Sequence, residues 1–266
     1  MSTEYLTTPT QPCWTHRGVS SFTMVAMVSL ARPTASRSSD PLTALWRHSE
    51  EAGALPILTW YDGTDRGELS ARTLLTWVTK SVHLLDSEGI AAGDVARLSV
   101  LGQRPGHWTS CVWLLASWWA GLRVDLTGLD EATVEVIGPD TDPVDSPEVL
   151  VQCSLTPLAT PCQNPVPGAI DNADVLAGPD DLVTARPAAS GSVWLRGCQE
   201  WTGEQLCSVV PLGRAVLLSP ERIRVGGGEL VATTLVSCLL GGGSLVLVES
   251  SDDVAAITTQ EGAVEV

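Results

Sequence analysis

Lysine is almost absent from this sequence. Lys80 is the only lysine among 266 residues, beside fourteen arginines, while Asp and Glu together number 31 and the formal net charge is −16. Such a charge repels the phosphates of nucleic acids, so we expect no nucleic-acid partner. Between residues 124 and 185 there is no Lys or Arg at all, and twelve carboxylates lie there. This stretch indicates a solvated acidic face, with a surface that binds a basic partner as the alternative.

Other patterns that carry chemistry are also missing. The seven cysteines form no C-x-x-C motif, and the pairs Cys153/Cys162 and Cys198/Cys207 have no histidine nearby, so no metal site is predicted. No G-x-S-x-G motif offers a hydrolase nucleophile. The apolar run 111–122 is too short to cross a bilayer and indicates a buried helix. We therefore expect free thiols, a cytoplasmic location and no membrane contact.

The first forty residues lack the periodicity of a helix or a strand. Residues 1–40 are rich in Ser and Thr, and the apolar stretch 22–31 is weaker than a signal sequence and is followed at once by Arg32. We expect a disordered leader, or a true start at Met24 or Met27.

Helices and strands alternate from residue 41 onwards. One face of the expected helix 70–88 is apolar, whereas residues 105–120 are apolar on nearly every face, as in a helix inside a layered fold. The alternation predicts an α/β fold, with a largely parallel sheet covered by helices on both faces. The other expected elements are helices at 41–52, from 202 and at 229–240, and strands at 57–61, 95–101, 122–126, 134–137, 149–152, 193–195, 215–218 and 244–248.

Composition also divides the chain. Residues 154–190 are rich in Pro, Ala and Asp and are expected to form a long connection. The predicted domain covers residues 41–250, with subdomains at about 41–153 and 188–250, and residues 251–266 follow as a tail.

Four segments resemble the N-terminal part of the adenylate-forming superfamily, which includes acyl-CoA synthetases, luciferase and adenylation domains. They are GELS (67–70), LDSEGIAAGDV (85–95), LASWWAGLRVD (115–125) and LLGGGSLVLV (239–248). Their order and spacing carry the resemblance, which is densest over 67–126. Within the superfamily the chain is similar to a group of short, uncharacterised actinobacterial proteins that stop before the ATP-grasping half.

The resemblance fails at the phosphate loop. In the family this loop is rich in Ser, Thr and Gly and carries a lysine, and together they hold the ATP phosphates. The corresponding region here, residues 188–194, keeps only Ser190, Gly191 and Ser192 and has no lysine. The later family motifs for adenine, ribose and magnesium, and the C-terminal catalytic domain, are absent. No catalytic residue or cofactor is predicted. Binding of ATP or AMP is possible, but no motif supports it.

Two further features are candidates for binding. His107, beside Trp108 at an expected helix start, is a candidate to line a cleft at the carboxyl edge of the preceding strand, although a histidine without a binding role is favoured. The triplet 226–228 before the expected helix could form an anion-binding nest, but Glu229 would repel an anion there, so a flexible turn is favoured.

Three hypotheses remain open from the sequence. In the first, a domain without independent adenylation activity binds an acyl or nucleotide-like ligand or a partner protein. In the second, another chain supplies the missing parts of a split acyl-adenylating enzyme. In the third, the acidic residues of 124–185 make a non-catalytic scaffold.

Overall fold

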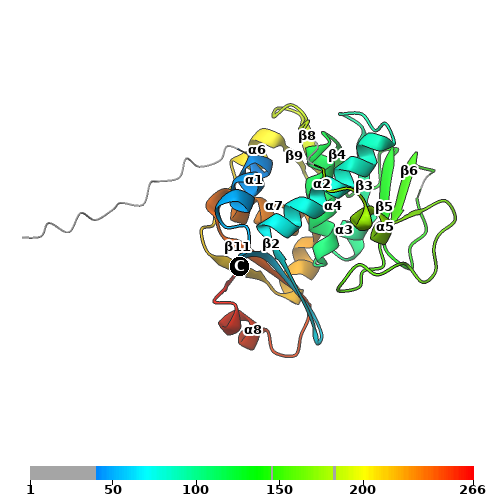
Figure 1. The fold of residues 1–266 in the computed structure, drawn as a ribbon. Helices are drawn as coiled ribbons and strands as arrows, with labels where there is room; N and C mark the ends of the chain where they lie inside the picture. The colour runs from blue at the N-terminus through cyan, green and yellow to red at the C-terminus, as the bar shows by residue number, and fades with distance from the viewer. Residues whose placement is uncertain (1–39, 145, 182–183) are drawn as a thin grey trace, which may run out of the picture. The chain divides into compact units, whose positions relative to one another are not determined.

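Two sheets with helices between them form the part of the chain that the structure describes. The structure is a computed structural model and describes residues 40–144, 146–181 and 184–266 (Figure 1). The predicted leader, apart from Asp40, lies outside the described residues.

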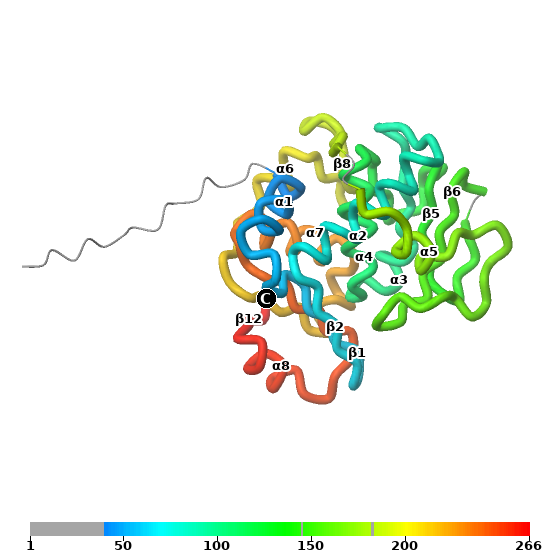
Figure 2. Tube along the Cα trace, in the orientation of Figure 1, coloured from blue at the N-terminus to red at the C-terminus, as the bar shows by residue number. Residues whose placement is uncertain are grey.

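Sheet A has the strand order β12-β10-β11-β1-β2, and all its neighbouring pairs are parallel except β1 with β2. Early and late parts of the chain meet in it, because β1 pairs with β11 (Figure 2). Its strands are β1 (Pro56–Asp62), β2 (Asp65–Ser70), β10 (Ala215–Leu218), β11 (Ser244–Ser250) and β12 (Val264–Glu265).

Sheet B has the order β7-β6-β5-β3-β4-β8-β9 and is parallel except between β8 and β9. The expected subdomains 41–153 and 188–250 therefore each contribute strands to both sheets. The strands of sheet B are β3 (Val95–Leu98), β4 (Arg123–Asp125), β5 (Val134–Ile137), β6 (Val149–Gln152), β7 (Ile170–Asp171), β8 (Val193–Arg196) and β9 (Glu200–Thr202).

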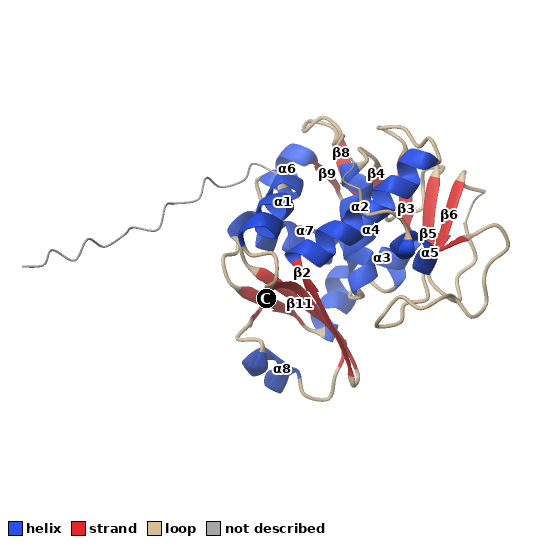
Figure 3. Cartoon of the chain, in the orientation of Figure 1, coloured by secondary structure: helices blue, strands red, loops and turns tan. Residues whose placement is uncertain are grey.

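Helices α2, α4 and α7 lie between the two sheets (Figure 3). Helix α4 contacts β1 of sheet A and β3 and β4 of sheet B, and α8 covers the outer face of sheet A. The predicted α/β class is confirmed, with two mostly parallel sheets where one was expected. The helices are α1 (Pro41–Glu51), α2 (Ala71–Ser87), α3 (Ser99–Gln103), α4 (Trp108–Trp119), α5 (Asn172–Ala177), α6 (Gly203–Cys207), α7 (Pro220–Gly241) and α8 (Val254–Gln260).

Helix α4 is buried along its whole length, which explains its lack of a polar face. Two of its tryptophans satisfy their indole N–H groups inside the core, whereas the buried indole N–H of Trp108 has no hydrogen-bond partner among the described residues. Trp113 donates to the side-chain oxygen of Asn172 at 3.0 Å, and Trp118 donates to the carbonyl of Trp194 at 2.9 Å. Burial of each such side chain stabilises the fold by about 2–3 kcal/mol. The tryptophan cluster is core packing.

Several boundaries differ from the sequence prediction. The strand expected at 95–101 ends at Leu98, where the chain turns into α3 and buries Val100 and Leu101. The connection 154–190 contains β7 and α5, and the residues after 250 form α8 and β12, which extends sheet A beside β10. An apolar pair such as Val100 and Leu101 fits a buried strand or a buried helix equally well.

Helix α7 consists of two helical segments that meet at a kink in the glycine triplet. The helix expected at 229–240 corresponds to the second segment, and the first segment, which begins at Pro220, was not expected. Gly227 interrupts the helix with φ +57° and ψ −157°, a conformation that glycine adopts easily. By length and apolar composition, α7 is the one helix in the described ranges that could cross a membrane, but 61% of the relevant window is buried. This burial is that of a core helix.

Candidate ligand site

A pocket lies at the carboxyl ends of β1 and β11, the edge at which open α/β sheets bind ligands. Its volume is 580 Å³, and Asp62 and Glu249 line it from the ends of these two strands. Arg104 lines it from the segment after α3, and Ile223 and Gly227 line it from α7. Arg224 of α7 lines it as well, so the pocket combines apolar walls with four charged side chains.

Glu249 and Asp62 hold Arg104 in a fixed position. The Nε atom of Arg104 donates to Glu249 at 2.8 Å, and its Nη2 atom donates to Asp62 at 3.1 Å. The hydrogen bonds to Glu249 raise the pKa of Arg104. Trp60 adds an indole N–H to Glu249 at 2.9 Å, and a Cβ at Gly106 would lie 2.6 Å from the Glu249 side chain. A residue larger than glycine at 106 would therefore disturb this ion pair.

The turn between β8 and β9 lies at the carboxyl edge of sheet B and holds a carboxylate from α7. Glu229 Oε2 accepts the backbone N–H of Cys198 at 2.7 Å and that of Gln199 at 3.4 Å. Its Oε1 atom accepts the indole N–H of Trp201 at 3.0 Å. Convergent N–H groups of this kind bind anions. Here the chain supplies the anion itself.

Arg196, at the end of β8, is also engaged within the domain. It forms ion pairs with Asp130 and with Glu200, and the hydrogen bond to Glu200 raises its pKa. Asp130 also binds Arg123, and that hydrogen bond lowers the pKa of Asp130. The positive charge nearest in sequence to the turn is thus already neutralised.

Ser190, Gly191 and Ser192 are exposed and lie before β8, at the amino edge of sheet B. The Ser192 hydroxyl donates to the Ala189 carbonyl at 2.6 Å, and the Ser190 carbonyl accepts the N–H of Glu204 at 2.7 Å. The three residues form an ordinary turn, and they line neither the pocket nor the β8–β9 turn.

His107 starts α4 just after β3 and α3, so it lies at the carboxyl edge of sheet B. The turn of Ser190–Ser192 lies at the opposite, amino edge of that sheet. His107 is fully buried, and its Nδ1 atom accepts the N–H of Thr109 at 3.2 Å, which caps α4. Burial, assisted by the charge of Arg104, lowers the pKa of His107 to about 3. The structure thus does not bring His107 and Ser190–Ser192 together.

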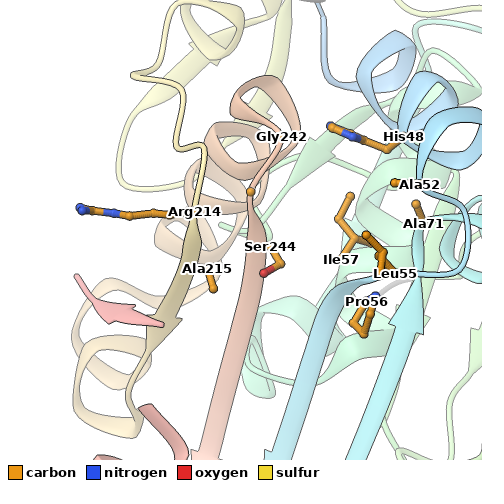
Figure 4. Close-up of a pocket in the computed structure, with 11 residues that line it drawn as sticks. His48, Ala52, Leu55, Pro56, Ile57, Ala71, Arg214, Ala215, Gly242 and Ser244 are labelled. Atoms are coloured by element: carbon orange, nitrogen blue, oxygen red, sulfur yellow. The ribbon is translucent and has the colours of Figure 1, made fainter. Parts of the chain in front are cut away.

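A smaller pocket of 190 Å³ lies at the amino ends of β1, β10 and β11 (Figure 4). His48 lines it and binds the Leu239 carbonyl at 2.8 Å, near the C-terminus of α7, where such contacts stabilise helix ends. Figure 4 shows the Arg214 side chain directed away from the other lining residues. Because no charged group converges on this space, we interpret it as a packing gap between secondary-structure elements and not as a ligand site.

Sequence reasoning missed four residues that shape these sites: Asp62, Arg104, Glu229 and Glu249. From the sequence, Glu229 was considered only as a residue that would repel an anion from 226–228, and the structure shows its carboxylate bound by N–H groups of the β8–β9 turn. Within the described residues, no group of three or more His, Cys, Asp and Glu side chains is placed to hold a metal ion.

Comparisons with known proteins find a relative by sequence and several solved structures with a similar fold. No family model matches it. A TIGR03089 family protein of Mycobacterium tuberculosis (strain ATCC 25618 / H37Rv) is 27% identical over 214 residues, which cover 74% of this chain and 84% of that protein.

Solved structures of acyl-CoA synthetases share its fold. An acyl-CoA synthetase of Brucella canis superposes with a TM-score of 0.64 at 14% identity and covers 84% of this chain and 46% of its own length. The acetoacetyl-CoA synthetase of Streptomyces lividans gives 0.62 at 15% identity, with 83% and 40% covered. The anthranilate CoA ligase AuaEII, solved with anthranoyl-AMP, gives 0.57 at 14% identity, with 82% and 46% covered.

The chain spans less than half the length of these solved enzymes. Its strand order, its helices and these superpositions agree with the resemblance found in residues 67–126. The chain has the fold of the N-terminal part of the adenylate-forming enzymes.

Proposed function

We propose that this chain is a binding domain for a small acyl or nucleotide-like ligand and has no adenylation activity of its own. The observation that supports this proposal is the 580 Å³ pocket at the carboxyl ends of β1 and β11. Pockets of this size with apolar walls and a few placed polar groups are typical ligand sites.

The position of the single lysine supports the second half of the proposal. The ammonium group of Lys80 donates to the Leu176 carbonyl at 2.8 Å, at the end of α5, and does not line the pocket. Loss of one group that stabilises the transition state costs on the order of 10²–10³ in rate. A chain whose only lysine caps a helix would activate ATP poorly on its own.

The pocket and the related fold support the proposed ligand class. Pro105 and Ile223 supply apolar walls that suit an acyl or aromatic group, and Arg104 supplies hydrogen-bond donors at one end. AuaEII, which shares the fold, was solved with anthranoyl-AMP. We therefore propose a ligand that combines an apolar group with a polar or nucleotide-like part.

The acidic scaffold has less support. Within the stretch 124–185, four carboxylates bind partners inside the domain instead of facing a partner. Asp125 accepts the N–H of Thr127, Glu135 accepts the hydroxyl of Ser99, Asp130 binds two arginines, and Asp171 accepts the N–H of Cys162.

Calorimetry with paired variants tests the pocket. Gly102 lines the pocket and Gly191 lies in the turn before β8, and a Cβ at either position would meet no atom within 4 Å. Gly102→Trp should fill the pocket and abolish the heat of binding of AMP or of a stable anthranoyl-adenylate analogue, whereas Gly191→Trp should leave it unchanged. No heat from the unmodified protein at millimolar ligand would contradict the proposal.

Pyrophosphate release tests the lack of activity. The purified protein with ATP and a carboxylic acid should release none. Release that appears only after cell extract is added, and is lost when this chain is omitted, would favour the split enzyme. Release by the purified protein alone would refute the proposal.

A further inference from the structure

The β8–β9 turn has the donors of an oxyanion site and contains an oxyanion that belongs to the chain. We propose that Glu229 is an internal competitor that closes this turn to external oxyanions such as phosphate. The inference goes beyond the proposed function, because it concerns a different edge of the fold and does not depend on what the pocket binds.

The contacts of Glu229 select for an oxygen anion. Both carboxylate oxygens face N–H donors, namely the backbone of Cys198 and Gln199 and the indole of Trp201. None of the ion pairs found among the described residues includes Glu229. N–H groups that converge without a cation form a neutral nest whose partner is an anion.

The backbone at the turn is shaped to admit the carboxylate. A Cβ at Gly197 would lie 2.3 Å from Glu229 Oε2, so any larger residue there would displace the carboxylate or the turn. Arg196, next to it, remains paired with Asp130 and Glu200. The turn therefore holds Glu229 through glycine and N–H groups and without help from an arginine.

Helix α7 is kinked beside this contact. Gly227, two residues before Glu229, has a positive φ, so a new helical segment begins after it and carries Glu229. Val231 and Ala232 in that segment are fully buried, and a Cβ at Gly228 would lie 2.8 Å from the Leu101 side chain. Packing in the core therefore holds Glu229 at the turn.

Amide chemical shifts of the ¹⁵N-labelled full chain, titrated with inorganic phosphate at constant ionic strength, test this inference. In the unmodified protein, the signals of Cys198, Gln199 and the Trp201 indole should not move. In Glu229→Ala the same three signals should shift and saturate in the millimolar range. Glu221→Ala is the matched control, since Glu221 lies in the same helix, is exposed and pairs with Arg224; it should behave like the unmodified protein.

Glu229→Gln is a second variant for the case in which the alanine variant does not fold, because it keeps the volume of the side chain and removes the charge. It should bind phosphate more strongly than the unmodified protein. The inference is overturned if the folded variants show no saturable shift at the turn, or if the unmodified protein shows the same shifts. Neither result depends on whether the pocket binds AMP.

Discussion

Charged side chains are arranged differently at the carboxyl edges of the two sheets. At sheet A, Asp62 and Glu249 hold Arg104 beside an open pocket. At sheet B, Glu229 fills the turn after β8, and Asp130 and Glu200 neutralise Arg196. One edge keeps space for a ligand, whereas the other satisfies its donors internally.

The difference shows that the same position in two parallel sheets does not imply the same kind of site. Both edges occupy the position where parallel strands end and ligands commonly bind. What separates them is whether side chains from the rest of the chain already use the available donors.

The largest expected effect tests whether sheet B depends on its internal charges. Glu135 is fully buried, and its oxygens pair with Arg97 and accept the Ser99 hydroxyl at 2.8 Å. Glu135→Ala should lower the free energy of unfolding by about 3–5 kcal/mol, because a buried ion pair with Arg97 is broken and the Ser99 hydroxyl loses its acceptor. Urea unfolding measures this, with the exposed Glu131→Ala as control. Equal stability of the two variants would contradict the importance of the buried charge.

The second change breaks the edge of sheet A. Glu249→Ala removes the acceptor of the buried Trp60 indole and leaves Arg104 paired with Asp62 alone. The free energy of unfolding should fall by about 2–3 kcal/mol, since hydrogen bonds to charged groups each contribute about 1.5–3 kcal/mol. Ligand binding in the pocket should change as well, as calorimetry will show. Glu68→Ala, an exposed position in β2, should alter binding little, and an equal effect there would argue against a specific role for Glu249.

The third prediction concerns acid. The folded chain keeps His107 neutral, with its pKa lowered to about 3, whereas the unfolded chain protonates it near pH 6.5. The contribution of neutral His107 to the free energy of unfolding is complete above pH 6.5 and is lost as the pH falls. The loss is about 2 kcal/mol between pH 7 and pH 5. His107→Asn keeps a capping side chain for α4 and should lose less stability over this range in urea unfolding. An equal loss of stability in the two proteins between pH 7 and pH 5 would contradict the lowered pKa of His107.

The smallest effect concerns the lone lysine. Lys80→Ala removes the hydrogen bond to the Leu176 carbonyl and should lower the free energy of unfolding by about 1 kcal/mol. Lys80→Arg can still donate and should lose less. Ligand binding measured by calorimetry should be the same in both variants; a loss of binding would place Lys80 in the site after all.

Local signals in the sequence predicted much of the fold. The helix expected at 41–52 is α1, and the Asp40 side chain caps it by accepting the N–H groups of Leu42 and Thr43. The helix expected from 202 is α6, which begins with a capping box of Thr202 and Gln205. The strands at 134–137, 149–152 and 215–218 have the expected bounds, because short apolar runs between turn residues leave few alternatives.

The sites could not be predicted in the same way, because their contacts are distant in sequence. Arg104 meets Glu249 across 145 residues, and Glu229 meets Cys198 across 31. No local pattern marks such partners. In α7 the glycine triplet breaks the helix at Gly227, as a local pattern can predict, whereas the helical segment before it was not predicted.

Chemical-shift mapping of the unmodified protein with AMP and a stable anthranoyl-adenylate analogue tests the contrast between the two edges most directly. The account predicts saturable shifts at Gly102, Gly227 and Glu249, and none at Cys198 or Gln199. Shifts at the β8–β9 turn with an unchanged pocket would contradict it.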